Sequence, residues 1–172
     1  SSPTERNLRV GIKFYEQSSS YKRAMLAMPQ NSQIVASQLA GDFLLPDDRE
    51  QPCVFIAGGI GITPFRSMIQ YLMDIGQRRP ITLIYVNRSP ADVVYQEVFD
   101  KAQRVLGLKT VYWYTDPSAA RFSSGGRTGR IDAALIKQEV PDYGRCLFYI
   151  SGPNAMVEAT KELLLKIGVS RN

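Results

Sequence analysis

The sequence contains no histidine, and this absence excludes more chemistry than any other feature of its composition. Ser-His-Asp hydrolases, Cys-His proteases and most zinc enzymes need imidazole as a base or as a metal ligand. The only two cysteines are Cys53 and Cys146, whereas an iron–sulfur cluster needs about four thiolates. Both lie in apolar runs far apart in the chain, which is typical of reduced, buried thiols. We therefore expect neither a metal site nor a disulfide framework.

Long apolar runs are also absent, since no stretch approaches the roughly 20 residues that cross a bilayer. With 172 residues, 44% of them hydrophobic and 22% charged, the chain has the composition of a soluble domain with one core and a small appendage. Its net charge of +5 suits a phosphate-bearing ligand or an acidic protein partner. The first residues, SSPTERN, include neither an initiator Met nor an apolar signal core. They indicate a piece of a longer chain.

The front of the chain has the pattern of β-structure. Residues 8–16 (LRVGIKFYE) partly alternate polar and apolar side chains, and residues 33–45 repeat this character around Gly41, so both are predicted strands. Residues 21–28 have helical propensity and follow a serine run that can cap a helix. The polar, turn-rich residues 46–52 are the predicted domain boundary.

After this boundary, strands alternate with helices. Short apolar strands are predicted at 53–57, 81–86, 110–114 and 146–151, and helices at 64–75, 91–106, 131–139 and 153–167. This alternation predicts an α/β fold: an open parallel sheet with helices on both faces. The aromatic run from Tyr112 to Tyr114 is expected to pack into the core of this fold more readily than to stack on a ligand.

A glycine-rich turn stands between the first of these strands and its helix, in VFIAGGIGITPFR. The Rossmann fingerprint G-x-G-x-x-G fails here, because Pro64 occupies the third glycine position. Gly58, Gly59 and Gly61 still permit positive φ and close backbone approach, and Thr63 can cap a helix whose first turn tolerates Pro64. The N–H groups at that helix start favour a pyrophosphate, for which Gly61 leaves room. A tight packing turn without a ligand is the alternative.

Two motifs carry a family resemblance. GGIGITPF resembles the pyridine-nucleotide motif of the ferredoxin–NADP reductase superfamily, and SGPNAMVEA at residues 151–159 resembles its later CGPxxM motif. The resemblance implies that residues 1–48 are part of a flavin-binding antiparallel β-barrel. It also implies that residues 49–172 are an NAD(P)-binding domain without its expected last strand.

The resemblance further implies roles for individual residues. Ser151, where the family more often has cysteine, would lie at the site of hydride transfer; capping of the helix at Pro153 is its other reading. Asn87 and Arg88 would face the adenosine ribose, with Arg88 either pairing with a 2′-phosphate or standing as a plain loop arginine. The remaining cofactor-binding residues implied are Gly58, Gly59, Ile60, Gly61, Ile62, Thr63 and Pro64 for the pyrophosphate, Gly152, Pro153 and Met156 for the nicotinamide, and Ser19, Ser20, Tyr21 and Lys22 for the flavin.

The implied activity is hydride transfer from NAD(P)H to FAD or FMN, followed by electron transfer to an acceptor protein or domain of the iron–sulfur, haem or membrane redox kind. This step needs no protein acid or base, so the absence of histidine is no obstacle. The alternative is a nucleotide-binding regulatory or docking module without turnover. Arg121, Arg127 and Arg130 would meet an acidic partner, a phosphate or only solvent. A cytoplasmic location is expected, including that of a cytoplasmic domain of a membrane-associated redox protein, and no nucleic-acid partner.

Overall fold

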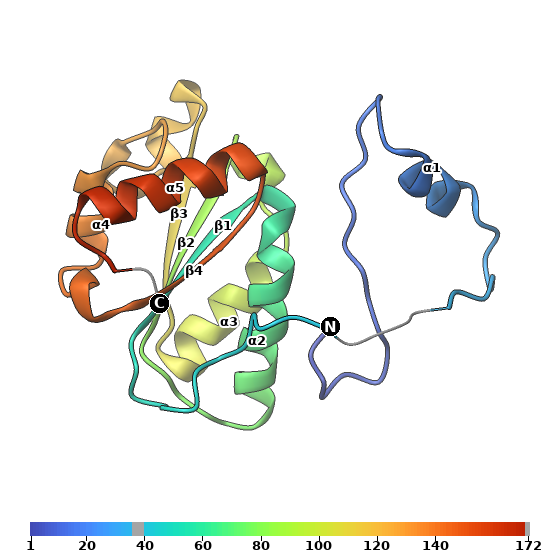
Figure 1. Ribbon diagram of the computed structural model, residues 1–172, viewed down its shortest axis with the longest axis horizontal. Helices are drawn as coiled ribbons and strands as arrows, with labels where there is room; N and C mark the ends of the chain where they lie inside the picture. The colour runs from blue at the N-terminus through green and yellow to red at the C-terminus, as the bar shows by residue number, and fades with distance from the viewer. Residues whose placement is uncertain (36–39, 171–172) are drawn as a thin grey trace.

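A computed structural model describes residues 1–35 and 40–170 of the chain, and its centre is a four-stranded parallel sheet (Figure 1). The strands β1 (Cys53–Gly58), β2 (Ile81–Asn87), β3 (Lys109–Tyr114) and β4 (Leu147–Ser151) lie in the order β3-β2-β1-β4. The strand order reverses at β1. The loop that follows β1 and the loop that follows β4 therefore run apart from each other at the carboxyl edge of the sheet. Open α/β sheets bind ligands at this kind of switch point.

Each central strand is buried on both faces, which explains its continuous apolar sequence. In β1, Cys53, Phe55 and Ala57 enter one core cluster, whereas Val54 and Ile56 enter the other. Ile56 lies opposite Ile84 of β2 on one side and Ile150 of β4 on the other. The four strands predicted after residue 52 are confirmed to within about one residue, and the α/β class with them.

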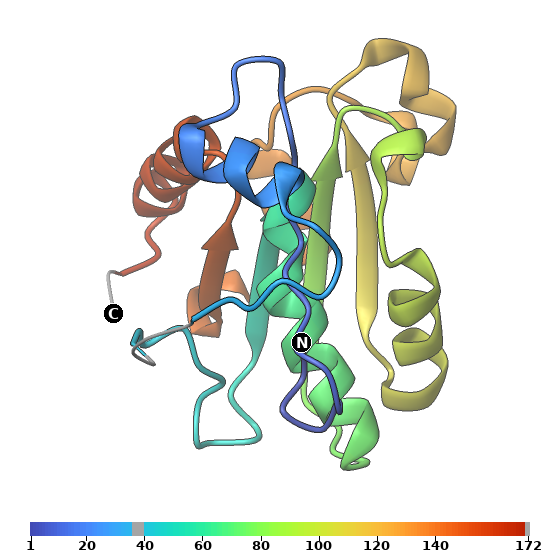
Figure 2. The same cartoon turned by 90° about the vertical axis from the view of Figure 1, so that its right-hand side faces the viewer.

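Two helices cover each face of the sheet (Figures 1 and 2). The helices α2 (Thr63–Asp74) and α3 (Gln96–Leu106) pack on one face, and α4 (Ala133–Glu139) and α5 (Asn154–Lys166) on the other. Short 3₁₀ turns complete the connections: η1 (Gly59–Ile62), η2 (Pro90–Asp92), η3 (Pro117–Phe122), η4 (Ser124–Gly126) and η5 (Tyr143–Arg145).

The helix predicted at 91–106 begins later than expected. Only its first residues form η2, and Tyr95 then adopts a left-handed conformation with φ of 60° before α3 starts. A non-glycine residue in this region interrupts a right-handed helix. At α4 the start is set by Asp132, whose side chain accepts a hydrogen bond of 2.7 Å from the N–H of Leu135.

The two strands predicted in residues 1–48, which we call the front segment, are wrong for the residues described. Residues 8–16, 33–35 and 40–45 form no strand, and residues 36–39 lie outside the described part of the chain. A strand needs a neighbour to pair with, and alternation in sequence does not supply one. The helix α1 (Ser20–Ala27) does form, and Ser19 caps it by accepting from the N–H of Lys22 at 3.4 Å. The barrel assignment of residues 1–48 stays a prediction.

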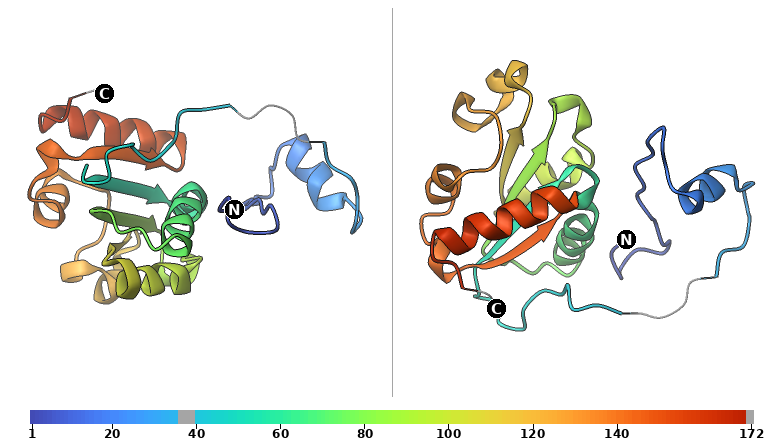
Figure 3. Two further views of the ribbon diagram at one scale, coloured as in Figure 1. Left: turned by 90° about the horizontal axis from the view of Figure 1, so that it is seen from below. Right: turned by 45° about the horizontal axis from the view of Figure 1, so that its top comes forward.

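The front segment stands beside the α2 face of the sheet and is held there by polar contacts (Figure 3). Arg66 on α2 forms an ion pair with Glu5, and the hydroxyl of Ser67 donates to the carbonyl oxygen of Ser1. The hydrogen bond from Arg66 lowers the pKa of Glu5 to about 2. Farther along, the hydroxyl of Tyr149 donates to the carbonyl oxygen of Leu44 at 2.6 Å. These contacts attach the start of the front segment to α2 and a residue near its end, Leu44, to β4.

In the described ranges, 1–35 and 40–170, no helix combines the length and the apolar character that crossing a bilayer requires.

Candidate functional site

A cavity of about 440 Å³ lies at the carboxyl ends of β1, β2 and β3, against the first turns of α5. Backbone and small side chains form one wall: Gly58, Gly59, Pro153, Ala155, Met156, Ala159 and Thr160. The other wall is formed by Val86, Asn87, Arg88, Asp92, Thr115, Arg130 and Ile131, together with Lys13 of the front segment. One apolar wall and one wall rich in cations suit a ligand that carries both a flat ring and a phosphate group.

Gly59 gives the turn after β1 its shape. Its φ is 51°, a left-handed conformation that a residue with Cβ adopts only with strain. A Cβ built at this position would meet no atom within 4 Å, so Gly59 faces the open cavity. The space beside Gly58 is filled instead, because a Cβ there would lie 2.4 Å from the sulfur of Met156. The turn therefore brings backbone next to the cavity at Gly59 and next to α5 at Gly58.

The room predicted beside Gly61 is filled by protein, whereas the assignment of Gly61 to the cofactor stays a prediction. A Cβ at Gly61 would lie 2.3 Å from the carbonyl oxygen of Ser151 and 2.7 Å from the Cα of Gly152. The space beside Gly61 is therefore filled by the turn after β4, and not left for a phosphate. A Cβ at Gly152 would in turn lie 3.1 Å from the Cα of Gly58. The glycines of the two sequence motifs pack backbone against backbone.

Two capping predictions are wrong. Thr63 has helical backbone angles and is the first residue of α2, with Ile62 in the N-cap position and no side-chain capping bond. Ser151 does not cap α5, because the N-cap there is Pro153 and again no side chain caps the helix. Thr63 is packed by the front segment: a Cβ at Gly11 would lie 2.9 Å from its methyl carbon.

Asn87 is the most unusual polar residue of the site. It ends β2, it is one of the residues that line the cavity, and it is only 4% exposed. Neither its amide nitrogen nor its amide oxygen has a partner of hydrogen-bond geometry among the residues described, although Asn87 lies near enough to the Tyr85 hydroxyl to lower the pKa of Tyr85, against the larger opposite effect of burial. A buried amide without a partner costs about 1–3 kcal/mol, so it is expected where a ligand supplies the partner.

The charges of the cavity differ in how they are engaged. Asp92 accepts from the N–H of Ser89 at 3.1 Å and from its hydroxyl at 2.9 Å, and Lys13 lies 4.0 Å from its other oxygen. Within the described residues, Arg88 and Arg130 form no ion pair and no side-chain hydrogen bond, and both are exposed at the rim. The cavity thus offers two unengaged guanidinium groups.

The structure gathers some of the predicted site residues and separates others. Gly58, Gly59, Asn87, Arg88, Pro153 and Met156 line the cavity, and Gly61 and Gly152 support its wall. Ser151 ends β4 behind this wall, and Ile62 is buried in the core. Ile60, Thr63 and Pro64 lie at the α2 side of the turn, and Ser19, Ser20, Tyr21 and Lys22 lie on or before α1, so none of the seven lines the cavity. Trp113 and Tyr114 are buried core residues, as expected.

Sequence reasoning missed Lys13 and Ala159 and left Arg130 open. Lys13 comes from the front segment and Arg130 from the loop before α4, so only the folded chain brings them to β2. The small residues Ala155 and Ala159 are four apart in the helix after SGP, a spacing that places them on one helical face. That spacing was a usable signal for a wall without bulky side chains.

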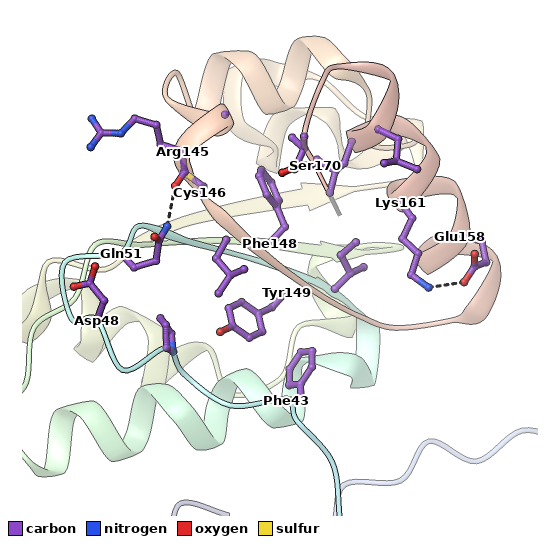
Figure 4. A pocket seen from close by; sticks show the side chains of 17 residues that line it. Phe43, Asp48, Gln51, Arg145, Cys146, Phe148, Tyr149, Glu158, Lys161 and Ser170 are labelled. Carbon is purple, nitrogen blue, oxygen red and sulfur yellow. Dashed lines mark hydrogen bonds and ion pairs between the residues drawn. The ribbon is translucent and has the colours of Figure 1, made fainter. Parts of the chain in front are cut away.

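A larger hollow, of about 860 Å³, runs along the outer edge of β4 (Figure 4). Phe148, Tyr149, Leu164 and Val169 contribute to its apolar lining, and Gln51 crosses it to donate to the carbonyl oxygen of Arg145 at 2.8 Å. Burial raises the pKa of the Cys146 thiol beside it. The hollow lies along a strand edge and away from the carboxyl ends, so we do not assign the nucleotide to it.

Comparison with known proteins assigns the family. The family model described as "Oxidoreductase NAD-binding domain" matches residues 55–162. The chain is 33% identical to a component of the Na(+)-translocating NADH-quinone reductase of Methylococcus capsulatus, covering 72% of this chain and 31% of that one. It is 27% identical to a flavohemoprotein of Oceanobacillus iheyensis, covering 77% of this chain and 32% of that protein.

Among solved structures, a flavohemoglobin from Malassezia yamatoensis shares the fold with a TM-score of 0.71 and 23% identity, over 93% of this chain and 40% of that one. The chain spans about a third of the length of the curated relatives it matches. From the matched residues, the sheet order and the two motifs, the chain belongs to the oxidoreductase NAD-binding domain family of the ferredoxin–NADP reductase superfamily.

Proposed function

We propose that the chain is the NAD(P)H-binding module of a flavoprotein oxidoreductase, which passes a hydride to FAD or FMN and then electrons to an acceptor protein or domain. The observation that carries the proposal is Asn87, a buried amide without a partner on the wall of a cavity that is built by both family motifs. Residues 1–48 would be the chain's part of the flavin-binding unit. A cytoplasmic location, where NAD(P)H is replenished, goes with this proposal.

The residues of the cavity fit a dinucleotide. The left-handed Gly59 leaves its surroundings open, so a diphosphate can approach the backbone at the start of η1. The Asn87 amide can both donate to and accept from a ribose or a base. Met156 and Ala159 offer an apolar surface to a ring. The cations at the rim balance the negative charge of phosphate groups.

In the proposed reaction this chain would position the cofactor and exclude water, and it would transfer no proton. The nicotinamide and the flavin supply the hydride chemistry when they are bound. The contact between Gly58 and Gly152 sets the end of β1 against the turn after β4, next to Gly58 and Pro153, which line the cavity. Ser151 then holds that turn through the pairing of β4 with β1, opposite Ala57. These contacts would hold in place the backbone against which a nicotinamide ring is positioned when the cofactor is bound.

The acceptor is proposed from the relatives. One is named as the reductase component of a propane 2-monooxygenase, 28% identical over 77% of this chain. Another belongs to an NADH-quinone reductase, and a third is a flavohemoprotein. The first two names join a reductase to a monooxygenase and to a quinone, and the third names a haem protein. We therefore propose a redox protein or domain as the partner and assign no single one.

Nucleotide binding is tested first, on the chain itself. Calorimetric titration with NAD⁺ and NADP⁺ should show saturable binding of at least one of them. Asn87→Leu should weaken that binding by about tenfold or more, because one hydrogen-bonded group is lost. The same change should not lower the unfolding free energy, because it removes a buried polar group that has no partner. Unchanged affinity in this variant would contradict the assignment of Asn87 to the ligand.

Turnover is tested second. With FAD or FMN added under anaerobic conditions, NAD(P)H should bleach the absorbance of the oxidised flavin. A flavin that stays oxidised in the longest form of the protein, while the nucleotide binds, would favour the alternative of a regulatory or docking module.

A further inference from the structure

We propose that Gly11 is a positioning residue, and that its contact with Thr63 sets how closely the front segment approaches the nucleotide cavity. The inference rests on the proposed function, because it concerns how the hydride donor and the residues predicted for the flavin are brought together. It follows from the contacts that the front segment makes along α2 and from the space left beside Gly11.

The first residues of the front segment lie along one face of α2 (Figure 2). Three polar contacts hold them there: Ser1 with Ser67, Thr4 with Asp74, and Glu5 with Arg66. Thr63 lies one helical turn before Arg66 and Ser67, so it belongs to the same face of the helix. The front segment therefore reaches the start of α2 along a path that these contacts already set.

Glycine is required at position 11 by space and not by a left-handed backbone. A Cβ built there would lie 2.9 Å from the methyl carbon of Thr63, 3.3 Å from the terminal carbon of Ile60 and 3.6 Å from the hydroxyl oxygen of Tyr95. Carbon atoms in contact prefer about 3.5–4.0 Å, so the first distance is too short. The φ of Gly11 is not in the left-handed region. Gly11 thus lets the front segment pass closer to the glycine turn than a residue with a side chain could.

The residues that receive Gly11 have little freedom to move aside. Thr63 is branched at Cβ and stands in the first turn of a helix, which restricts its χ1 angle. Tyr95 has a left-handed φ of 60°, and its ring faces the guanidinium group of Arg66 at 5.7 Å. Arg66 is held in turn by its ion pair with Glu5. A methyl group added at position 11 should therefore displace the front segment and not α2.

A displacement at Gly11 is passed on toward the cavity. Lys13, two residues further along, lines the cavity and lies 4.0 Å from Asp92. The ammonium group of Lys22, one of the residues predicted for the flavin, donates to the carbonyl oxygen of Lys13 at 3.0 Å. Hydride transfer requires reacting atoms about 3–3.5 Å apart, so a shift of about 1 Å is enough to slow it.

The first test measures the attachment of the front segment without any cofactor. Trypsin cleaves after Arg9 and Lys13, on either side of Gly11, and cleavage requires this part of the chain to detach from α2. Mass spectrometry should show cleavage at these sites about tenfold faster in Gly11→Ala than in the parent. Thr63→Ser removes the methyl carbon that the new Cβ would meet. In the Thr63→Ser background, Gly11→Ala should change the cleavage rate by less than about twofold.

The second test measures hydride transfer and nucleotide affinity separately. With FAD or FMN added and NAD(P)H at saturation, the rate of flavin bleaching in stopped flow should fall about tenfold in Gly11→Ala. Nucleotide affinity in calorimetry should change by less than about twofold, because Gly11 does not line the cavity and the strand ends stay in place. A residue needed only for folding would lower the rate and the binding capacity together.

Gly144→Ala is the matched control. It adds the same methyl group at a position where a Cβ would meet no atom within 4 Å, outside both the front segment and the nucleotide cavity. Cleavage and bleaching should both match the parent. Circular dichroism establishes that every variant keeps its helices and its sheet.

Cleavage of Gly11→Ala at the parent's rate, or the same acceleration with and without Thr63→Ser, would overturn the contact. Faster cleavage with an unchanged bleaching rate would overturn its role in hydride transfer and leave the proposed function standing. Failure of every nucleotide to bind, or a flavin that stays oxidised in the parent, would overturn the proposed function and that role with it. The cleavage rates would then still decide whether the contact holds the front segment.

Discussion

Replacing Gly61 by alanine tests whether the glycine turn is shaped by the neighbouring strand or by a ligand. The added Cβ would lie 2.3 Å, 2.5 Å and 2.7 Å from three backbone atoms of Ser151 and Gly152. Carbon atoms pack best at about 3.5–4.0 Å, so the two turns must separate by roughly 1 Å. Backbone atoms cannot rotate out of the way as a side-chain end can.

The expected cost follows from this displacement. Overpacking of this kind lowers the unfolding free energy by about 1–3 kcal/mol, and we expect the upper part of that range. For a chain of this size each kcal/mol corresponds to about 2–4 °C, so the melting temperature should fall by roughly 4–10 °C. Nucleotide affinity should fall too, because Gly58 and Gly152 move with the turn.

Urea and thermal unfolding, followed by circular dichroism, measure the effect. Gly144→Ala is the control, since Gly144 has ordinary φ and a Cβ there would meet nothing within 4 Å. Its stability should stay within about 0.5 kcal/mol of the parent. The unfolding free energy of Gly59→Ala should lie between those of the other two variants, about 1 kcal/mol below the parent, because only the left-handed φ of residue 59 is strained. If Gly61→Ala is as stable as Gly144→Ala yet binds no nucleotide, the space belongs to the ligand and our packing argument is refuted.

Three further predictions concern the contacts that hold the fold. The pKa of Glu5 is lowered from 4.5 to about 2, chiefly by the hydrogen bond from Arg66, so their pairing stabilises fully above pH 4.5 and is lost as pH falls toward 2. Glu5→Gln should remove this part of the acid dependence of the urea midpoint; an unchanged dependence would show that the pair does not persist in solution. Trp113→Phe should cost about 1–3 kcal/mol, because the Trp113 ring N–H donates to the carbonyl oxygen of Gly129 at 2.8 Å; circular dichroism is the readout, since this is the only tryptophan. Asp132→Ala should cost about 1 kcal/mol through loss of the α4 cap, and Asp132→Asn should restore most of it.

The α/β part of the fold was predictable because its signals are local. Continuous apolar runs such as residues 53–57 occur where a strand is covered on both faces, and the structure buries every residue of β1. The front segment failed for the opposite reason. The alternation in residues 8–16 says which side chains would share a face, but a strand also needs a partner, and the described chain offers it none.

At the site, sequence located the glycines but not their neighbours. Nothing in GGIGITPF distinguishes Gly59, which faces the cavity, from Gly61, which faces the backbone of Ser151. That difference depends on the pairing of β4 with β1, a contact between distant parts of the chain. The places of Arg130 and Lys13 at the cavity could not be predicted from the sequence for the same reason. Asn87 could be named from its place after a strand, whereas its unpartnered amide is visible only in the structure.

The direct contact among Gly58, Gly61 and Gly152 limits how this protein can be re-engineered. A chimera that takes only one of the two turns from a relative would set a foreign backbone against a surface shaped for another. Grafting should therefore succeed when both turns are exchanged as a pair, together with Met156, whose sulfur fills the space beside Gly58.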